Sequence, residues 1–149
     1  MKRLDREFIL KAVKCTDGNS QNAVKIHGSE DAVNYARAFY SDDLVIYESA
    51  FIILLNRQNN TIGWAKIGQG GVSGTTVDIK LVCKYAIDAL ASGVIFVHNH
   101  PSGNTDPSSM DCQLINRMKE ALKTLDVNLL DAIIITENDS YSFQNEGRL

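Results

Sequence analysis

The sequence contains little cysteine and lacks any long apolar run. The three cysteines, Cys15, Cys83 and Cys112, are an odd number at wide spacing, which does not match the disulfide framework of a small secreted protein. No apolar run approaches the ~18 residues of a membrane span, and no charged start followed by an apolar stretch indicates a signal peptide. We therefore expect a cytoplasmic protein with no membrane partner.

The sequence also lacks a strong charge of either sign. Its formal net charge is -3, so it has no general attraction for a phosphate backbone, and a nucleic-acid partner would need a local basic patch. In the densest basic stretch, acidic side chains are interleaved with basic ones, which is typical of a solvated face; the residues are Lys2, Arg3, Asp5, Arg6, Glu7 and Lys11. A nucleic-acid partner is therefore only weakly indicated.

Proline is scarce and confined to one segment. Pro101 and Pro107 are the only two, so the rest of the chain is free to form regular structure. With 149 residues, of which 44% are hydrophobic, the chain suits one compact soluble domain. Residues 1–28 show no clear periodicity, and we expect the domain to occupy residues 29–149.

The order of apolar patterns predicts the α/β class, with a mixed β-sheet flanked by helices. Apolar residues at helical spacing behind a capping Ser29 predict a helix over 29–41, and residues 44–55 and 61–67 are typical of two strands joined by a hairpin turn. The remaining patterns predict a glycine-rich loop at 68–74, a helix from Ile79 to near Gly93, a short buried strand at 94–97, a helix with Ser108 at or near its N-cap, and strands at 129–136 and 141–143.

Two of the three histidines follow the most apolar strand, in His98-Asn99-His100. In extended backbone, residues two apart point to the same side, so both imidazoles can reach one point. Asp111 falls in the first turn of the next helix, from which a carboxylate can face back toward the strand end. Two imidazoles and one carboxylate suit zinc, and three protein ligands leave a fourth position open, as in catalytic rather than structural sites.

An alternative is that Ser108 and Asp111 only cap a helix, because Ser-x-x-Asp before an apolar run is a capping signature. Taken alone, that explanation would be preferred. It does not explain why two histidines follow the most apolar strand, and one helix start can hold both a cap and a ligand. We therefore predict that His98, His100 and Asp111 bind zinc.

Glu48 is the candidate for the carboxylate that a zinc hydrolase usually adds as a general base. It lies within the predicted strand 44–55, between two apolar stretches, where a buried carboxylate without a function would cost free energy. A Glu48 that faces water at a strand edge is equally compatible with the residues alone.

Taken together, these residues resemble the JAMM pattern of the JAB/MPN metalloenzymes: Glu48, then His98-x-His100, seven residues, Ser108, two residues and Asp111. The stretch His98-Asn99-His100-Pro101-Ser102-Gly103, with Pro107-Ser108, is similar to the RadC branch in particular. The similarity extends from about residue 29 to the end of the chain. The N-terminal helix-hairpin-helix module of RadC proteins is not expected in a chain of this length.

The resemblance implies a role for each residue of the pattern. His98, His100 and Asp111 would bind Zn²⁺, Glu48 would be the general acid/base, and Ser108 would help to stabilise the oxyanion. It also implies a mixed α/β sandwich like that of cytidine deaminases, although their His-x-Glu and Pro-Cys-x-x-Cys motifs are absent from this sequence.

The function that follows is zinc-dependent hydrolysis of an amide bond in a peptide or protein substrate. Two alternatives stay open: a non-catalytic zinc-containing module that serves DNA metabolism or a mobile element, and a metal-dependent nuclease suggested by the repair label of RadC proteins. The acidic balance of the chain disfavours the nuclease. Substrate specificity is expected to lie in loops 68–76 and 101–107, and the sequence leaves pairing into a homodimer open.

Overall fold

Five strands form one mixed sheet in the computed structural model, which describes residues 23–70 and 76–149. The strand order is β2-β1-β3-β4-β5, and β3 and β4 are the parallel pair among otherwise antiparallel neighbours. The strands are β1 (Ser49–Leu55), β2 (Thr61–Gln69), β3 (Gly93–Asn99), β4 (Asn128–Ile135) and β5 (Ser140–Ser142); the helices are α1 (Ser29–Arg37), α2 (Ile79–Asp88), α3 (Ser109–Lys123) and a short 3-10 helix, η1 (Asp42–Val45). The predicted α/β class with a mixed, helix-flanked sheet is confirmed.

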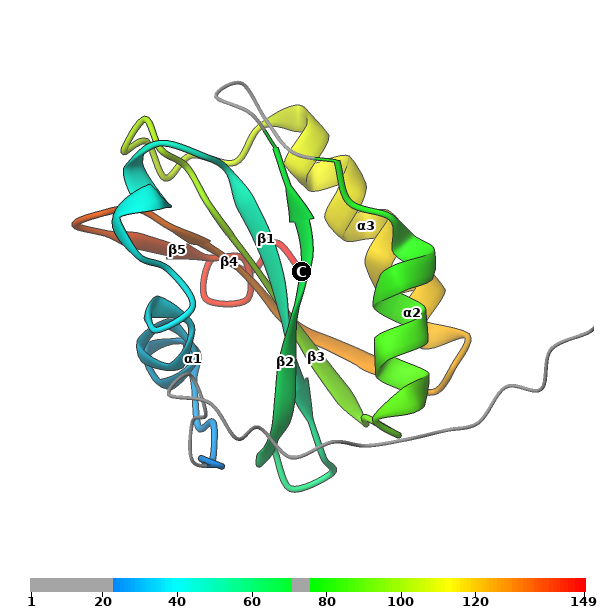
Figure 1. Ribbon diagram of the computed structural model, residues 1–149. Helices are drawn as coiled ribbons and strands as arrows, with labels where there is room; N and C mark the ends of the chain where they lie inside the picture. The colour runs from blue at the N-terminus through cyan, green and yellow to red at the C-terminus, as the bar shows by residue number, and fades with distance from the viewer. Residues whose placement is uncertain (1–22, 71–75) are drawn as a thin grey trace, which may run out of the picture.

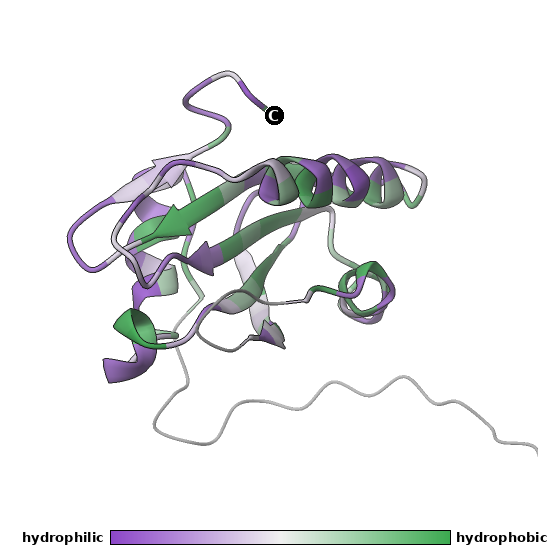
Figure 2. Ribbon diagram, turned by 90° about the horizontal axis from the view of Figure 1, so that it is seen from above, coloured by the Kyte–Doolittle hydropathy of each residue, from purple (hydrophilic) through white to green (hydrophobic). Residues whose placement is uncertain are grey.

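Helices cover both faces of this sheet, with α1 on one face and α2 and α3 on the other (Figure 1). Because strand side chains alternate between faces, Phe96 belongs to the core beneath α2 and α3, whereas its neighbour Ile95 belongs to the core beneath α1. Figure 2 shows the hydrophobic residues along the central strands and on one side of the helices. Even-numbered positions of β3 therefore face α3.

The central strand β3 lies between β1 and β4 and is buried along its whole length. A strand covered on both faces needs apolar residues at every position, which explains the apolar run that predicted it. The predicted helix from Ser108 is α3, and the last two predicted strands match β4 and β5 to within one residue.

The predicted strand over 44–55 is wrong in its first part. Strand β1 begins at Ser49, and η1 precedes it. Both the backbone N–H and the hydroxyl of Ser41 donate to Asp43 Oδ1, at 3.1 and 3.0 Å, and the Asp43 carbonyl accepts two backbone N–H groups. Such short polar side chains stabilise turns in place of strand pairing. Glu48 therefore lies in the connection that leads into β1.

The predicted helix over 29–41 is also longer than α1. Ser29 is its first residue, the N-cap position is Gly28 with no side-chain cap, and the helix ends at Arg37. The expectations for the basic N-terminal stretch, for Cys15 and for the middle of the glycine-rich loop concern residues outside those described. No helix in the described part of the chain is long and apolar enough to cross a membrane.

Candidate metal centre

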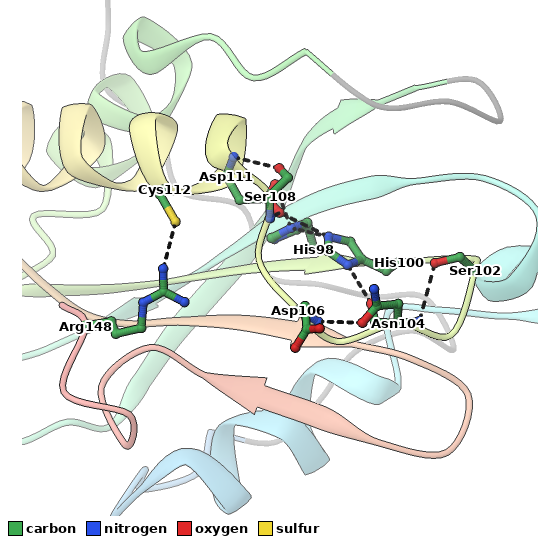
Figure 3. A network of polar contacts seen from close by, with 9 residues as sticks. All are labelled: His98, His100, Ser102, Asn104, Asp106, Ser108, Asp111, Cys112 and Arg148. Carbon is green, nitrogen blue, oxygen red and sulfur yellow. Dashed lines mark hydrogen bonds and ion pairs between the residues drawn. The ribbon is translucent and has the colours of Figure 1, made fainter.

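The end of β3 and the start of α3 bring His98, His100 and Asp111 together (Figure 3). His98 lies within β3, and its side chain is 2% exposed. The backbone N–H of His100 still donates to the Ile135 carbonyl of β4 at 3.0 Å, so the strand pairing continues past the assigned end of β3. Both imidazoles consequently face α3, whose first turn carries Asp111.

The donor atoms of these three side chains have the spacing of ligands around one ion. The two Nε2 atoms of His98 and His100 lie 3.1 Å apart, and each is 3.2 Å from a different carboxylate oxygen of Asp111. Zinc bonds to nitrogen and oxygen are ~2.0–2.1 Å long, which puts tetrahedral ligand atoms ~3.3 Å from one another. The residues present therefore fit a zinc ion.

The carboxylate of Glu48 completes this group. Its donor atom and those of His98, His100 and Asp111 all lie within 4.8 Å of one another. In the antiparallel register of β1 and β3, Ala50 is opposite His98, and continuing that register by two residues brings Glu48 opposite His100. The Glu48 side chain therefore lies on the same side of the sheet as His98 and His100. Together with Asp111 these residues form a His/His/Asp/Glu cluster that could hold a metal ion.

The loop after β3 orients the ring of His100. The Asn104 carbonyl lies 2.7 Å from Nδ1 of His100, and a carbonyl can only accept, so Nδ1 carries the proton and the lone pair is on Nε2. The chain reaches this position through a turn in which the Gly103 N–H donates to the His100 carbonyl at 3.1 Å. Gly103 has a φ of 84°, which favours glycine.

Asp111 belongs both to the helix cap and to the cluster, so the two interpretations of the sequence are compatible. Its backbone N–H donates to Ser108 Oγ at 3.0 Å, and its Oδ2 accepts from the Ser108 N–H at 2.8 Å. The same Oδ2 faces His100. The capping box thus fixes the carboxylate, while the exposed hydroxyl of Ser108 keeps its own hydrogen free to donate within the described part of the chain.

The ring of His98 is held mainly by packing. It stacks on Phe96 with ring centroids 5.2 Å apart and an interplanar angle of 28°. Its Nδ1 is buried and has no hydrogen-bond partner among the described residues. Only the Nε2 side of this ring therefore takes part in polar contacts of the cluster.

The pKa values of three groups in the cluster, Glu48, His100 and Asp111, are shifted by their contacts and by burial. Burial acts to raise the pKa of Asp111, but its contacts with His100 and His98 hold that pKa well below the usual range. Contact with Asp111 raises the pKa of His100. Burial raises the pKa of Glu48, against the opposing attraction of His98 and His100. A carboxylate with a raised pKa is a better proton acceptor.

A cavity of about 230 Å³ adjoins this cluster and is lined by Glu48, His98 and Asp111. The apolar side chains of Val77, Met110 and Leu114 form another part of its wall. Sequence reasoning had not singled out these residues, since apolar positions next to a site look like ordinary core or surface positions. Cys112 does not take part, because its sulfur accepts a hydrogen bond from Arg148 at 3.3 Å on the side away from the histidines (Figure 3).

Comparison with protein families matches residues 26–148 to the RadC-like JAB domain. The UPF0758 protein of Flavobacterium johnsoniae is 40% identical over 123 residues, which are 83% of this chain and 53% of that protein. A UPF0758 protein of Porphyromonas gingivalis is 40% identical over 103 residues (68% and 45%), and one of Neisseria meningitidis is 32% identical over 127 residues (85% and 56%). The chain therefore spans about half the length of these relatives. The matched range contains every described helix and strand, and the chain belongs to the RadC-like JAB domain family.

Proposed function

We propose that this chain is a zinc-dependent hydrolase that cleaves an amide bond, peptide or isopeptide, in a peptide or protein substrate. The observation that carries the proposal is the position of Glu48, whose carboxylate lies within 4.8 Å of three donor atoms that fit zinc. Three protein ligands beside a separate carboxylate are typical of catalytic rather than structural zinc sites.

Each residue has a distinct role in this proposal. His98, His100 and Asp111 hold the zinc ion, which when bound polarises the substrate carbonyl and lowers the pKa of a water molecule. Glu48 accepts the proton of the attacking water and passes it to the leaving nitrogen. The Ser108 hydroxyl donates a hydrogen bond to the substrate oxygen that becomes negatively charged.

The cavity beside the cluster supports a peptide as the substrate. Its apolar wall includes Met110, which is 78% exposed, together with Val77 and Leu114. An exposed apolar side chain at the mouth of a cavity suits contact with a peptide side chain. The net charge of -3 provides no general attraction for a nucleic-acid backbone.

The test is hydrolysis of a broad panel of peptides and isopeptides by zinc-loaded protein, with Glu48→Gln as the matched variant. We expect Glu48→Gln to retain zinc by elemental analysis and to lose about 10²- to 10⁴-fold in kcat, since it removes the general base but no ligand. Equal hydrolysis by the two proteins, or none by either, would overturn the proposal.

Two other outcomes would identify one of the alternative functions, a non-catalytic module or a nuclease. A protein that hydrolyses nothing but loses melting temperature on chelation would be a non-catalytic zinc-containing module. A salt-dependent affinity for DNA, together with metal-dependent cleavage of DNA, would instead indicate a nuclease.

A further inference from the structure

The side chain of Asn99, between the two histidines, faces away from the metal centre and is fully buried at 0% exposed. It makes three short hydrogen bonds. Its Nδ2 donates to the carbonyls of Leu44 and Tyr47, at 2.7 and 2.8 Å, and its Oδ1 accepts from the backbone N–H of Ser49 at 2.7 Å. Both amide hydrogens and the carbonyl oxygen of Asn99 are therefore engaged.

All three bonds go to the segment that carries Glu48. The partners lie on both sides of Glu48 in the chain, in the stretch from η1 to the first residue of β1. On the other side, the Glu48 carbonyl accepts from the Gly70 N–H at 2.8 Å. The backbone around Glu48 is thus held between the end of β2 and the side chain of Asn99.

Packing holds this segment only in part. The three side chains just before Glu48 are apolar and about half exposed: Val45 is 47% exposed, Ile46 49% and Tyr47 41%. Leu44, by contrast, packs against the core beneath α1. Side chains that bury little apolar area give little stabilisation to one backbone conformation. The hydrogen bonds of Asn99 therefore join this segment to β3, beside the packing of Leu44 and a hydrogen bond from the Tyr40 hydroxyl to the Ser49 carbonyl at 3.2 Å.

We infer that Asn99 is a positioning residue, whose side chain fixes the Glu48 carboxylate beside the two histidines that flank Asn99 in β3. Asn99 thereby ties the base to the strand that presents the ligands: its two neighbours would bind the metal, and its own side chain holds the segment just before β1 that carries Glu48. The catalytic part of the inference rests on the proposed function of Glu48.

The experiment compares wild type with Asn99→Ala in zinc affinity, kinetics and backbone exchange. Asn99 is not a ligand, so zinc affinity measured by chelator competition is expected to stay within about threefold, whereas loss of an orienting contact to a ligand costs about 10- to 100-fold. A misplaced base is expected to lower kcat by about 10- to 100-fold at unchanged KM. Hydrogen exchange of the Ser49 amide is expected to accelerate, with that of Val97 in β3 unchanged.

Asn56→Ala is the matched control. Asn56 is also an asparagine whose Oδ1 accepts two backbone N–H groups, from Gln58 and Asn60 at 2.9 and 3.0 Å, in the hairpin at the far end of β1. Its loss is expected to lower stability with no change in kcat. If Asn99→Ala does not fold, Asn99→Ser replaces it, because a hydroxyl leaves a polar group in place but is too short to reach all three partners.

A double-mutant cycle shows whether Asn99 acts through Glu48. In the Glu48→Gln background, Asn99→Ala is expected to change the residual rate by less than about twofold, because residues that act as a unit are not additive. Three results would each overturn the inference. They are losses in kcat that multiply in the double variant, a zinc affinity that falls as much as kcat in Asn99→Ala, and a Ser49 amide that stays protected from exchange in Asn99→Ala. If Glu48→Gln hydrolyses like wild type, the proposed function fails, and the Ser49 exchange rate alone decides whether Asn99 holds the segment.

Discussion

Two aspartates with little solvent exposure have pKa values that shift in opposite directions. Asp111, 13% exposed, faces two imidazoles that favour its charged form. Asp131, 5% exposed, has no cation among its polar contacts with the described residues. It accepts hydrogen bonds from the Ser142 hydroxyl and from the N–H groups of Ala132 and Gln144, at 2.6, 2.7 and 3.1 Å. Burial therefore raises the pKa of Asp131 despite these bonds.

The raised pKa of Asp131 predicts how the stability of an Asp131→Asn variant depends on pH. A pKa that is higher in the folded than in the unfolded protein means that ionised Asp131 destabilises the fold above that pKa, and that the cost disappears as the pH falls below the unfolded value near ~3.9. Asparagine can keep one oxygen toward the two N–H groups and donate to Ser142. Relative to wild type, we expect Asp131→Asn to gain unfolding free energy between about pH 3 and pH 7, measured by urea denaturation at each pH.

Asp131→Ala is the control for the hydrogen bonds themselves. It leaves the Ala132 and Gln144 N–H groups without their acceptor, so it is expected to cost about 1–3 kcal/mol at pH 7. A difference between wild type and Asp131→Asn that stays constant with pH would contradict the raised pKa of Asp131.

At the scale of elements, the start of α3 combines a helix cap with a candidate metal ligand, Asp111. The capping role of Ser108 can be separated from its proposed contact with the oxyanion. Glycine is nearly as good an N-cap as serine, so Ser108→Gly is expected to lose only a few tenths of a kcal/mol in unfolding free energy. It has no hydroxyl, so the proposed hydrogen bond to the oxyanion disappears, and kcat is expected to fall by about 10²- to 10³-fold. Thermal unfolding and peptide hydrolysis of the same sample measure both effects.

Ser108→Thr is the matched control, since threonine keeps the hydroxyl and also caps helices. It is expected to retain most of the activity. A Ser108→Gly variant with the kcat of wild type would show that Ser108 only caps α3 and orients Asp111.

The elements could be predicted from sequence where burial alone determines them. Strand β3 is covered on both faces, and α3 has a capping box followed by a single apolar stripe, so local pattern and tertiary position agree. The residues before β1 are as apolar as a strand, but Asp43 and Ser41 close a turn there. Side-chain bonds of that kind compete with strand pairing and are invisible to an apolar pattern.

The residues of the candidate site also differ in how far the sequence could predict them. His98, His100 and Asp111 could be identified because strand alternation and a helix start constrain them locally. Residues alone left Glu48 undecided, since its position opposite His100 depends on the pairing of β1 with β3. Asn99 was no more than a spacer in the sequence, because its partners lie 50 to 55 residues earlier in the chain. Two of them, Leu44 and Tyr47, lie in the part of the predicted strand that was wrong.

For the whole molecule, the candidate metal centre joins β3, at the middle of the sheet, to α3, which packs on it. A ligand that binds only the folded chain stabilises it by about 2.7 kcal/mol at a free concentration of one hundred times Kd. For a chain of this size that corresponds to a rise in Tm of roughly 5–11 °C. We expect scanning calorimetry to show this rise when zinc is added to chelator-treated wild type, and no rise for His100→Ala, which lacks one ligand. Equal Tm values for wild type with and without zinc would mean that the four side chains do not form a metal site in the folded protein.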